Sequence, residues 1–169
     1  AILTNVRPFR PEATGALVPC ETFDNATLFC EVDNEKGRFP LTVKTWRIAP
    51  GEMDSWYIRV TGDKLSMRFS TKQPRTLETL RYDTPGEAQV WRVEDIGYSS
   101  AYPSVTGSIF EFGFTDAILQ VFASFVDQVV QGNDAAVPFG CATLDETRQH
   151  HQILTAALES NKTRSTVAL

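Results

Sequence analysis

Apolar and polar residues alternate in short segments over the first two-thirds of the chain, and turn-forming residues separate these segments. Residues 41–48, LTVKTWRI, show the alternation clearly, as expected of a strand with two different faces. The same kind of segment predicts further strands at residues 26–32, 56–61, 65–70, 76–82 and 89–94. The links between them are short, and parallel strands need long crossovers, so we expect antiparallel pairing.

The last third of the chain has helical periodicity. Residues 115–131 predict a helix, and Gly132 is placed to end it. Its apolar positions at helical spacing are Ile118, Val121, Phe122, Phe125 and Val129. Residues 144–161 predict a second helix and residues 166–169 a final short strand. Because strands come first and helices afterwards, we expect an α+β fold over residues 1–169 as a single domain: a mainly antiparallel, open-faced β-sheet with helices packed on one face.

Neither face of the strand expected at residues 41–48 is cleanly polar. One face carries Leu41, Val43, Thr45 and Arg47, and the other carries Thr42, Lys44, Trp46 and Ile48. A mixture of apolar and charged groups on an outer face predicts a partner there, and self-association is our main expectation.

Net charge, hydrophobicity and cysteine content limit the partners and the cellular location that we expect for this chain. The net charge of −5 argues against a nucleic-acid partner, which would require clustered Lys and Arg. There is no apolar run of about 18 residues and no visible secretion leader, so we expect no membrane partner and a cytoplasmic location. The three cysteines, Cys20, Cys30 and Cys141, lack metal-finger spacing and are expected to be reduced. The chain starts at AILTNVRPF without an initiator Met, which suggests a processed or excised fragment.

Residues 139–154, FGCATLDETRQHHQIL, concentrate reactive side chains. Thr143 and Glu146 have the spacing of a capping box, in which each side chain bonds the other residue's amide, so a helix start is the favoured interpretation. His150 and His151 point about 100° apart on a helix and cannot easily act together. A metal site built from Glu146, His150 and Cys141 remains an alternative, although its ligand spacing is not convincing.

Two other segments contain charged or aromatic side chains that could form a binding site. Glu21 and Asp24 form a carboxylate cluster before a strand, where a turn role is favoured. Residues 47–56 are expected to form a hairpin tip, and charged groups beside an indole suit a polyhydroxylated ring. Its candidate substrate-binding residues are Arg47, Glu52, Asp54 and Trp56. Residues 98–114 form a long, aromatic, glycine-containing link, and links of that length are often functional.

Four segments in sequence carry a resemblance to a known family: DNATLFCEV, WYIRVTGDKLSMRFST, DAILQVFASFVDQVVQG and PFGCATLDETRQHHQILTAALES. Their order resembles the C-terminal domain of the glucose–fructose oxidoreductase/inositol dehydrogenase (Gfo/Idh/MocA) family. The matched positions are Gly62, Lys64, Ser66, Phe69, Phe125, Asp127, Gly132, Ala142, Thr143, Glu146, His151, Ala156, Ala157 and Ser160. Leu65 stands where the family has a second glycine, which leaves open how that turn is made. Thr147 replaces a frequent alanine.

The resemblance implies reversible hydride transfer between NAD or NADP and a hydroxyl-bearing carbon of a sugar, cyclitol or related polyol. The family's Rossmann domain, E-K-P lysine and D-x-x-x-H histidine are missing from these 169 residues. We therefore expect no catalytic residue, no bound cofactor and no metal in this chain, which would be inactive alone. The resemblance places Glu111 and Asp116, with the 47–56 tip, at a substrate pocket, and it implies a homo-oligomer joined through the open sheet face. A non-catalytic binding or scaffold module with the same fold is the alternative.

Overall fold

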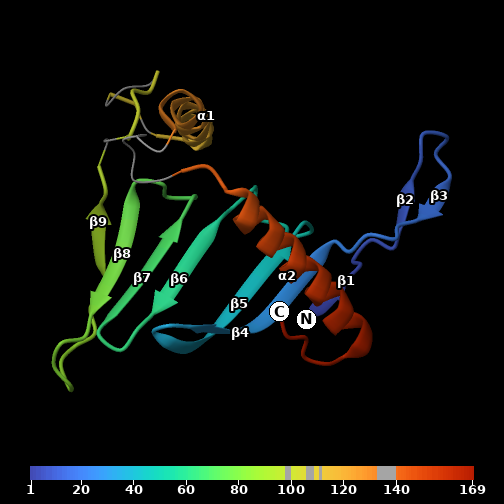
Figure 1. Cartoon of the computed structure of the whole chain (residues 1–169), viewed down its shortest axis with the longest axis horizontal. Helices are drawn as coiled ribbons and strands as arrows, with labels where there is room; N and C mark the ends of the chain where they lie inside the picture. The colour runs from blue at the N-terminus through green and yellow to red at the C-terminus, as the bar shows by residue number, and fades with distance from the viewer. Residues whose placement is uncertain (98–99, 106–108, 111, 133–139) are drawn as a thin grey trace. The chain divides into compact units, whose positions relative to one another are not determined.

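Residues 1–97, 100–105, 109–110, 112–132 and 140–169 are described in the computed structural model (Figure 1). The strands are β1 (Ile2–Thr4), β2 (Phe9–Pro11), β3 (Leu17–Pro19), β4 (Asn25–Asn34), β5 (Gly37–Trp46), β6 (Tyr57–Thr61), β7 (Leu65–Ser70), β8 (Thr76–Arg81) and β9 (Arg92–Asp95). The helices are α1 (Phe114–Gln131) and α2 (Leu144–Thr163). All strand pairs among the described residues are antiparallel, so the predicted α+β class is confirmed.

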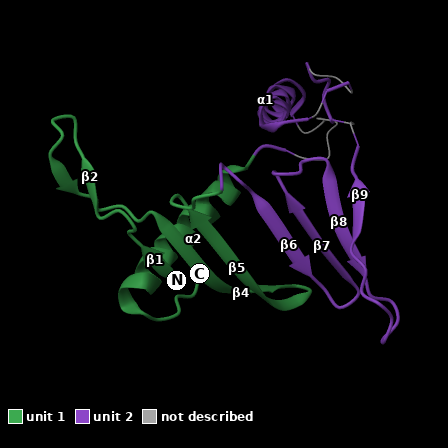
Figure 2. Cartoon of the chain, turned by 180° about the vertical axis from the view of Figure 1, so that it is seen from behind, with its two compact units in different colours: residues 1–51, 142–169 green, residues 52–141 purple. Residues whose placement is uncertain are grey.

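The chain divides into two compact units, residues 1–51 with 142–169 and residues 52–141 (Figure 2). The first unit contains the sheets β1-β4-β5 and β2-β3 together with α2, and the second contains the sheet β6-β7-β8-β9 together with α1. The single domain expected over residues 1–169 stays a prediction.

The first unit is built around the long hairpin of β4 and β5. Its turn is closed by the Lys36 amide, which donates to Asn34 Oδ1 at 2.9 Å, and by Gly37, whose φ of 120° suits glycine. The strand register places Leu28 opposite Val43 on an apolar face. Leu28, only 7% exposed, and Ala157 of α2 are the buried apolar residues of this unit among those described.

Helix α2 is joined to the edge of β1. The Leu3 amide donates to Asn161 Oδ1 at 3.1 Å, and the N-terminal ammonium donates to Ser160 Oγ at 2.7 Å. The final strand expected at residues 166–169 is wrong. Helix α2 ends at Thr163, its C-cap Arg164 has the left-handed conformation, and residues 166–169 form no strand.

Asp24 ties the start of the first unit together. Its side chain is buried, accepts from the Arg7 amide at 2.9 Å and forms an ion pair with Arg10. The Arg7 hydrogen bond, followed by Arg10, holds the pKa of this carboxyl below its ordinary value despite opposing desolvation. Through these contacts Asp24 anchors the hairpin of β2 and β3, which the alternation pattern did not predict. The turn role favoured from the sequence for Glu21 and Asp24 stays a prediction.

The second unit contains an antiparallel meander. The Gly62 amide donates to the Leu65 carbonyl at 3.0 Å and closes the turn between β6 and β7. A side-chain carbon added to Gly62 would lie 2.8 Å from that carbonyl oxygen. This close approach explains how the turn is made with leucine at position 65.

Both faces of this meander combine apolar and charged side chains. The register places Ile58, Phe69 and Leu77 in one row, which ends at Glu94 of β9. The other face carries the ion pair of Arg68 with Glu78 and the buried Leu80, and the Arg68 guanidinium lies 4.3 Å from the centre of the Trp91 ring.

Candidate functional site

The predicted binding residues of the loop at 47–56 fall in different compact units. Arg47 belongs to the first unit, whereas Glu52, Asp54 and Trp56 belong to the second. Within the units, β5 pairs with β4 and β6 pairs with β7, and the expected hairpin tip at residues 47–56 stays a prediction.

Glu52 and Trp56 contact the turn after β7. Glu52 Oε2 lies 2.8 Å from Lys72 Nζ, and the Trp56 amide donates to Thr71 Oγ1 at 2.9 Å. The hydrogen bond from Lys72, followed by one from Ser55, lowers the pKa of Glu52. The Trp56 side chain is 71% exposed. The Trp56 backbone and the Glu52 carboxylate therefore meet adjacent residues of one turn, and the substrate-binding role of these residues stays a prediction.

The other predicted binding residues differ in backbone conformation, hydrogen bonding and burial. Asp54 has a φ of 43°, an uncommon backbone conformation for a residue other than glycine. The Arg47 amide donates to the Asp24 carbonyl at 2.9 Å, which fixes its backbone. Asp116 is 5% exposed, and its Oδ2 accepts from the Gly113 amide at 2.9 Å at the start of α1. Glu111 lies outside the described residues.

A cavity of about 330 Å³ lies in the second unit between α1 and the loops next to β8 and β9. The described residues that line it are Pro74, Arg75, Ile96, Gly97, Ser100, Ala101, Phe112, Ala117, Gln120 and Val121. Arg75 is the one charged residue among them. Sequence reasoning missed Arg75, although the long link at residues 98–114 was the signal that pointed to this region.

Hydrogen bonds to Tyr102 shape the cavity wall. The side-chain amide of Gln120 accepts from the Tyr102 amide at 2.8 Å and donates to the Tyr102 carbonyl at 2.9 Å. Ser100 Oγ donates to the same carbonyl at 2.7 Å. The Tyr102 hydroxyl donates to Asp127 at 2.9 Å, and desolvation, followed by that hydrogen bond, raises the pKa of Tyr102. Helix α1 and the loop that includes Tyr102 are therefore joined by polar side chains.

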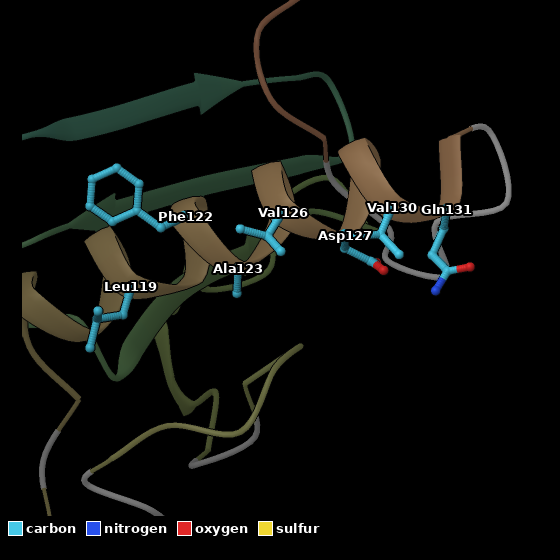
Figure 3. A pocket seen from close by; sticks show the side chains of 7 residues that line it. All are labelled: Leu119, Phe122, Ala123, Val126, Asp127, Val130 and Gln131. Carbon is cyan, nitrogen blue, oxygen red and sulfur yellow. The ribbon is translucent and has the colours of Figure 1, made fainter.

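A second hollow, of about 540 Å³, runs along α1 itself (Figure 3). It is lined by Leu119, Phe122, Ala123, Val126, Asp127, Val130 and Gln131. Phe122, Val126 and Val130 project from the helix and are exposed. This surface is apolar and open, with Asp127 as its one charged group among the described residues.

The reactive stretch before α2 forms the predicted capping box. The Glu146 amide donates to Thr143 Oγ1 at 3.1 Å, and the Thr143 amide donates to Glu146 Oε2 at 2.7 Å. The backbone hydrogen bond from Thr143 lowers the pKa of Glu146. In the part of the chain that the structure describes, no three His, Cys, Asp or Glu side chains gather as a metal site would require.

The described residues do not fit a dinucleotide cofactor. Such a site uses parallel strands with a glycine-rich turn leading into a helix, and the strand pairs described here are all antiparallel. Neither helix in the described part of the chain combines the length and apolar character needed to span a bilayer.

Comparison with known proteins finds solved structures that share the fold, but no protein that matches by sequence. No family model matches the chain, and no curated protein matches its sequence. Its structure is similar to an oxidoreductase domain protein from Kribbella flavida, with a TM-score of 0.72 and 17% identity over 97% of this chain and 42% of that chain. An NAD binding oxidoreductase from Klebsiella pneumoniae gives a TM-score of 0.72 at 17% identity, over 97% and 43% of the two chains.

Levoglucosan dehydrogenase in complex with NADH and L-sorbose also shares the fold. Its TM-score is 0.72 at 18% identity, and the similarity covers 97% of this chain and 43% of that chain. The chain thus spans less than half the length of these solved structures. At such low identities the similarity establishes a shared fold.

Proposed function

We propose that these residues form the C-terminal, substrate-side part of an NAD(P)-dependent oxidoreductase of the Gfo/Idh/MocA family, acting on a sugar, cyclitol or related polyol. The observation that carries the proposal is the match of 97% of this chain to about 42% of several oxidoreductases, two of which are described as binding NAD or NADH. The motif order in the sequence supports the same family. The parent would hold the nucleotide and the catalytic lysine and histidine outside these residues.

The substrate contacts of this proposal come from Arg47, Glu52, Asp54 and Trp56, with Glu111 and Asp116 further along the chain. The Trp56 side chain is exposed, and its backbone and the Glu52 carboxylate meet adjacent residues of the turn after β7, which supports a role in holding a hydroxylated ring. Asp116 acts in this scheme by fixing the start of α1, because its carboxylate is committed to the Gly113 amide. The nicotinamide would supply hydride transfer.

We also propose that the chain forms a homo-oligomer through the open face of the β1-β4-β5 sheet. Phe29 and Trp46 are exposed on one face according to the strand register, with Lys44 lying 5.1 Å from the centre of the Trp46 ring. Light scattering should report a dimer or larger species, and Phe29→Glu should reduce it to a monomer. Leu17→Glu, on the separate β2-β3 hairpin, serves as the matched control. A monomeric parent chain would contradict the oligomer.

The polypeptide upstream of Ala1 provides the decisive test of the oxidoreductase. We expect it to contain a G-x-G-x-x-G turn after a strand and an E-K-P motif further on. An extended protein including that segment should bind NADH, measured by its fluorescence, and should show sugar-dependent reduction of the nucleotide. The 169-residue chain alone should do neither. Tight nucleotide binding by the short chain would overturn the fragment interpretation.

A scaffold module with the same fold is the second candidate. It shares the described fold and needs no nucleotide-binding segment. Upstream sequence without either motif would favour it over the oxidoreductase. The cytoplasmic location stays a prediction in both cases.

A further inference from the structure

We propose that the apolar outer face of α1 is the surface on which the upstream part of the parent chain docks. The outer face is the side of the helix away from its buried residues, and it carries Ile118, Phe122, Phe125, Val126, Val129 and Val130. This inference rests on the proposed function for the existence of an upstream, nucleotide-binding part. It adds the surface by which that part is held to these residues.

The outer face forms one continuous apolar patch. Its side chains recur three and four positions apart, so they are neighbours on the helix surface. Phe122, Phe125, Val126, Val129 and Val130 are each between 56% and 69% exposed. Figure 3 shows three of these side chains projecting from the helix. An exposed apolar patch of this kind marks an interaction site.

The charged groups of α1 are used elsewhere. The helix contains two charged residues, Asp116 and Asp127, and no Lys, Arg or Glu. The Asp116 carboxylate accepts from the Gly113 amide, and the Asp127 carboxylate accepts from the Tyr102 hydroxyl. A helix that borders water carries polar and charged side chains on its outer face. The outer face of α1 therefore has the composition of a helix inside a protein.

The composition of the outer face favours a permanent protein partner. A helix that lies on a membrane combines its apolar side with a side rich in Lys and Arg, and α1 has neither residue. A small ligand needs polar groups that orient it in an enclosed pocket, whereas the hollow along α1 is open and mainly apolar. Transient protein interfaces are as polar as ordinary surface, but permanent ones resemble the core of a domain.

The upstream part of the parent fits the description of a permanent partner. The similarity that covers 97% of this chain covers only 42% to 43% of the matched oxidoreductases, so more than half of each lies outside it. A segment of the same polypeptide is always present at a high effective concentration. The homo-oligomer proposed above uses the β1-β4-β5 sheet of the first unit, which leaves α1 available for this contact.

Photo-cross-linking in the extended protein tests the contact directly. Phe122→p-benzoylphenylalanine keeps an aromatic side chain at the outer face and forms a covalent bond on illumination with a C–H group that it touches. Mass spectrometry should map its cross-links to peptides upstream of Ala1. Arg148→p-benzoylphenylalanine is the matched control, because Arg148 is an exposed residue of α2 in a charged environment. It should give no such cross-links.

Thiol labelling provides a second measurement. Val126→Cys in the folded extended protein should react with a maleimide at least about tenfold more slowly than Arg148→Cys, because a covered thiol reacts only during local opening. Each rate is taken relative to the same protein unfolded in urea, and peptide mapping separates the new site from the three native cysteines. In the 169-residue chain, shown to be folded by circular dichroism, the two sites should react at similar relative rates.

Two results would overturn the inference: cross-links from position 122 confined to residues 1–169 of the same or a second copy, or labelling of Val126→Cys as rapid as that of Arg148→Cys in the extended protein. Neither measurement depends on nucleotide binding. An extended protein that binds NADH but leaves α1 accessible would contradict this inference alone. Upstream cross-links in a protein that binds no NADH would support the docking surface and contradict the oxidoreductase proposal.

Discussion

Replacing Gly62 by alanine should destabilise the second compact unit. The added carbon would lie 2.8 Å from the Leu65 carbonyl oxygen, and this oxygen also accepts the hydrogen bond that closes the turn between β6 and β7. The oxygen can move away only by disturbing the adjacent pair of Thr61 with Ser66. Forcing an extra carbon into a tight site costs about 1–3 kcal/mol. Alanine also restricts the unfolded chain more than glycine does, and this effect stabilises the fold by about 0.4–1 kcal/mol. The net decrease in the free energy of unfolding should therefore be about 1–2 kcal/mol.

Urea unfolding followed by circular dichroism measures this loss. The midpoint for Gly62→Ala should fall with an unchanged slope, and the melting temperature should fall by about 2–8 °C. A Gly62→Ala protein as stable as the original would refute the argument that close approach, rather than sequence preference, requires glycine here.

Three further predictions concern the first unit. Thr143→Ala should cost about 1 kcal/mol in urea unfolding, because the Glu146 amide loses its acceptor, whereas Thr143→Ser should retain the cap. The lowered pKa of Asp24 means that its ionised form stabilises the fold above its ordinary value of 3.8, and this contribution should be lost as pH falls through the lower folded pKa. Unfolding measured from pH 5 down to pH 2.5 should show that loss in the original chain and a flatter profile in Asp24→Asn. Leu28→Ala should cost about 2–5 kcal/mol in urea unfolding, and exposed Leu17→Ala less than about 0.5 kcal/mol.

The sequence predicted those helices and strands well whose formation depends on residues close together in the chain. The alternation in residues 41–48 lies largely within β5, and Gly132 ends α1 as expected, with a φ of 61°. The capping box of Thr143 and Glu146 marks the start of α2. Each of these features depends on residues within one turn or one strand, so the sequence contains the whole cause.

Features that depend on distant partners were not predictable in the same way. The hairpin of β2 and β3 is anchored by Asp24, and the Arg10 contact joins residues 14 positions apart. The hydrogen bond from the Leu3 amide to Asn161 likewise joins residues 158 positions apart. Strand-like composition alone therefore indicates where a strand can form but not whether a partner edge is available.

The candidate site shows the same limit. The loop at residues 47–56 drew attention because its charged groups surround an indole, and the structure brings Glu52 and Trp56 to one turn. Arg75 has no neighbouring motif in the sequence, and its placement at the cavity depends on the pairing of β8 with β9.

Helix α1 shows why apolar periodicity identifies a helix without fixing the face it buries. Its buried residues are polar: Asp116, Gln120 and Ser124, which recur every four positions, with Ser124 fully buried. Gln120 satisfies both backbone groups of Tyr102, in a loop that has no strand partner among the described residues. Unpaired backbone groups in such a loop carry a high cost, so the polar stripe faces the loop. The apolar residues of α1 are therefore left on its other sides, where Phe122, Val126 and Val130 are exposed.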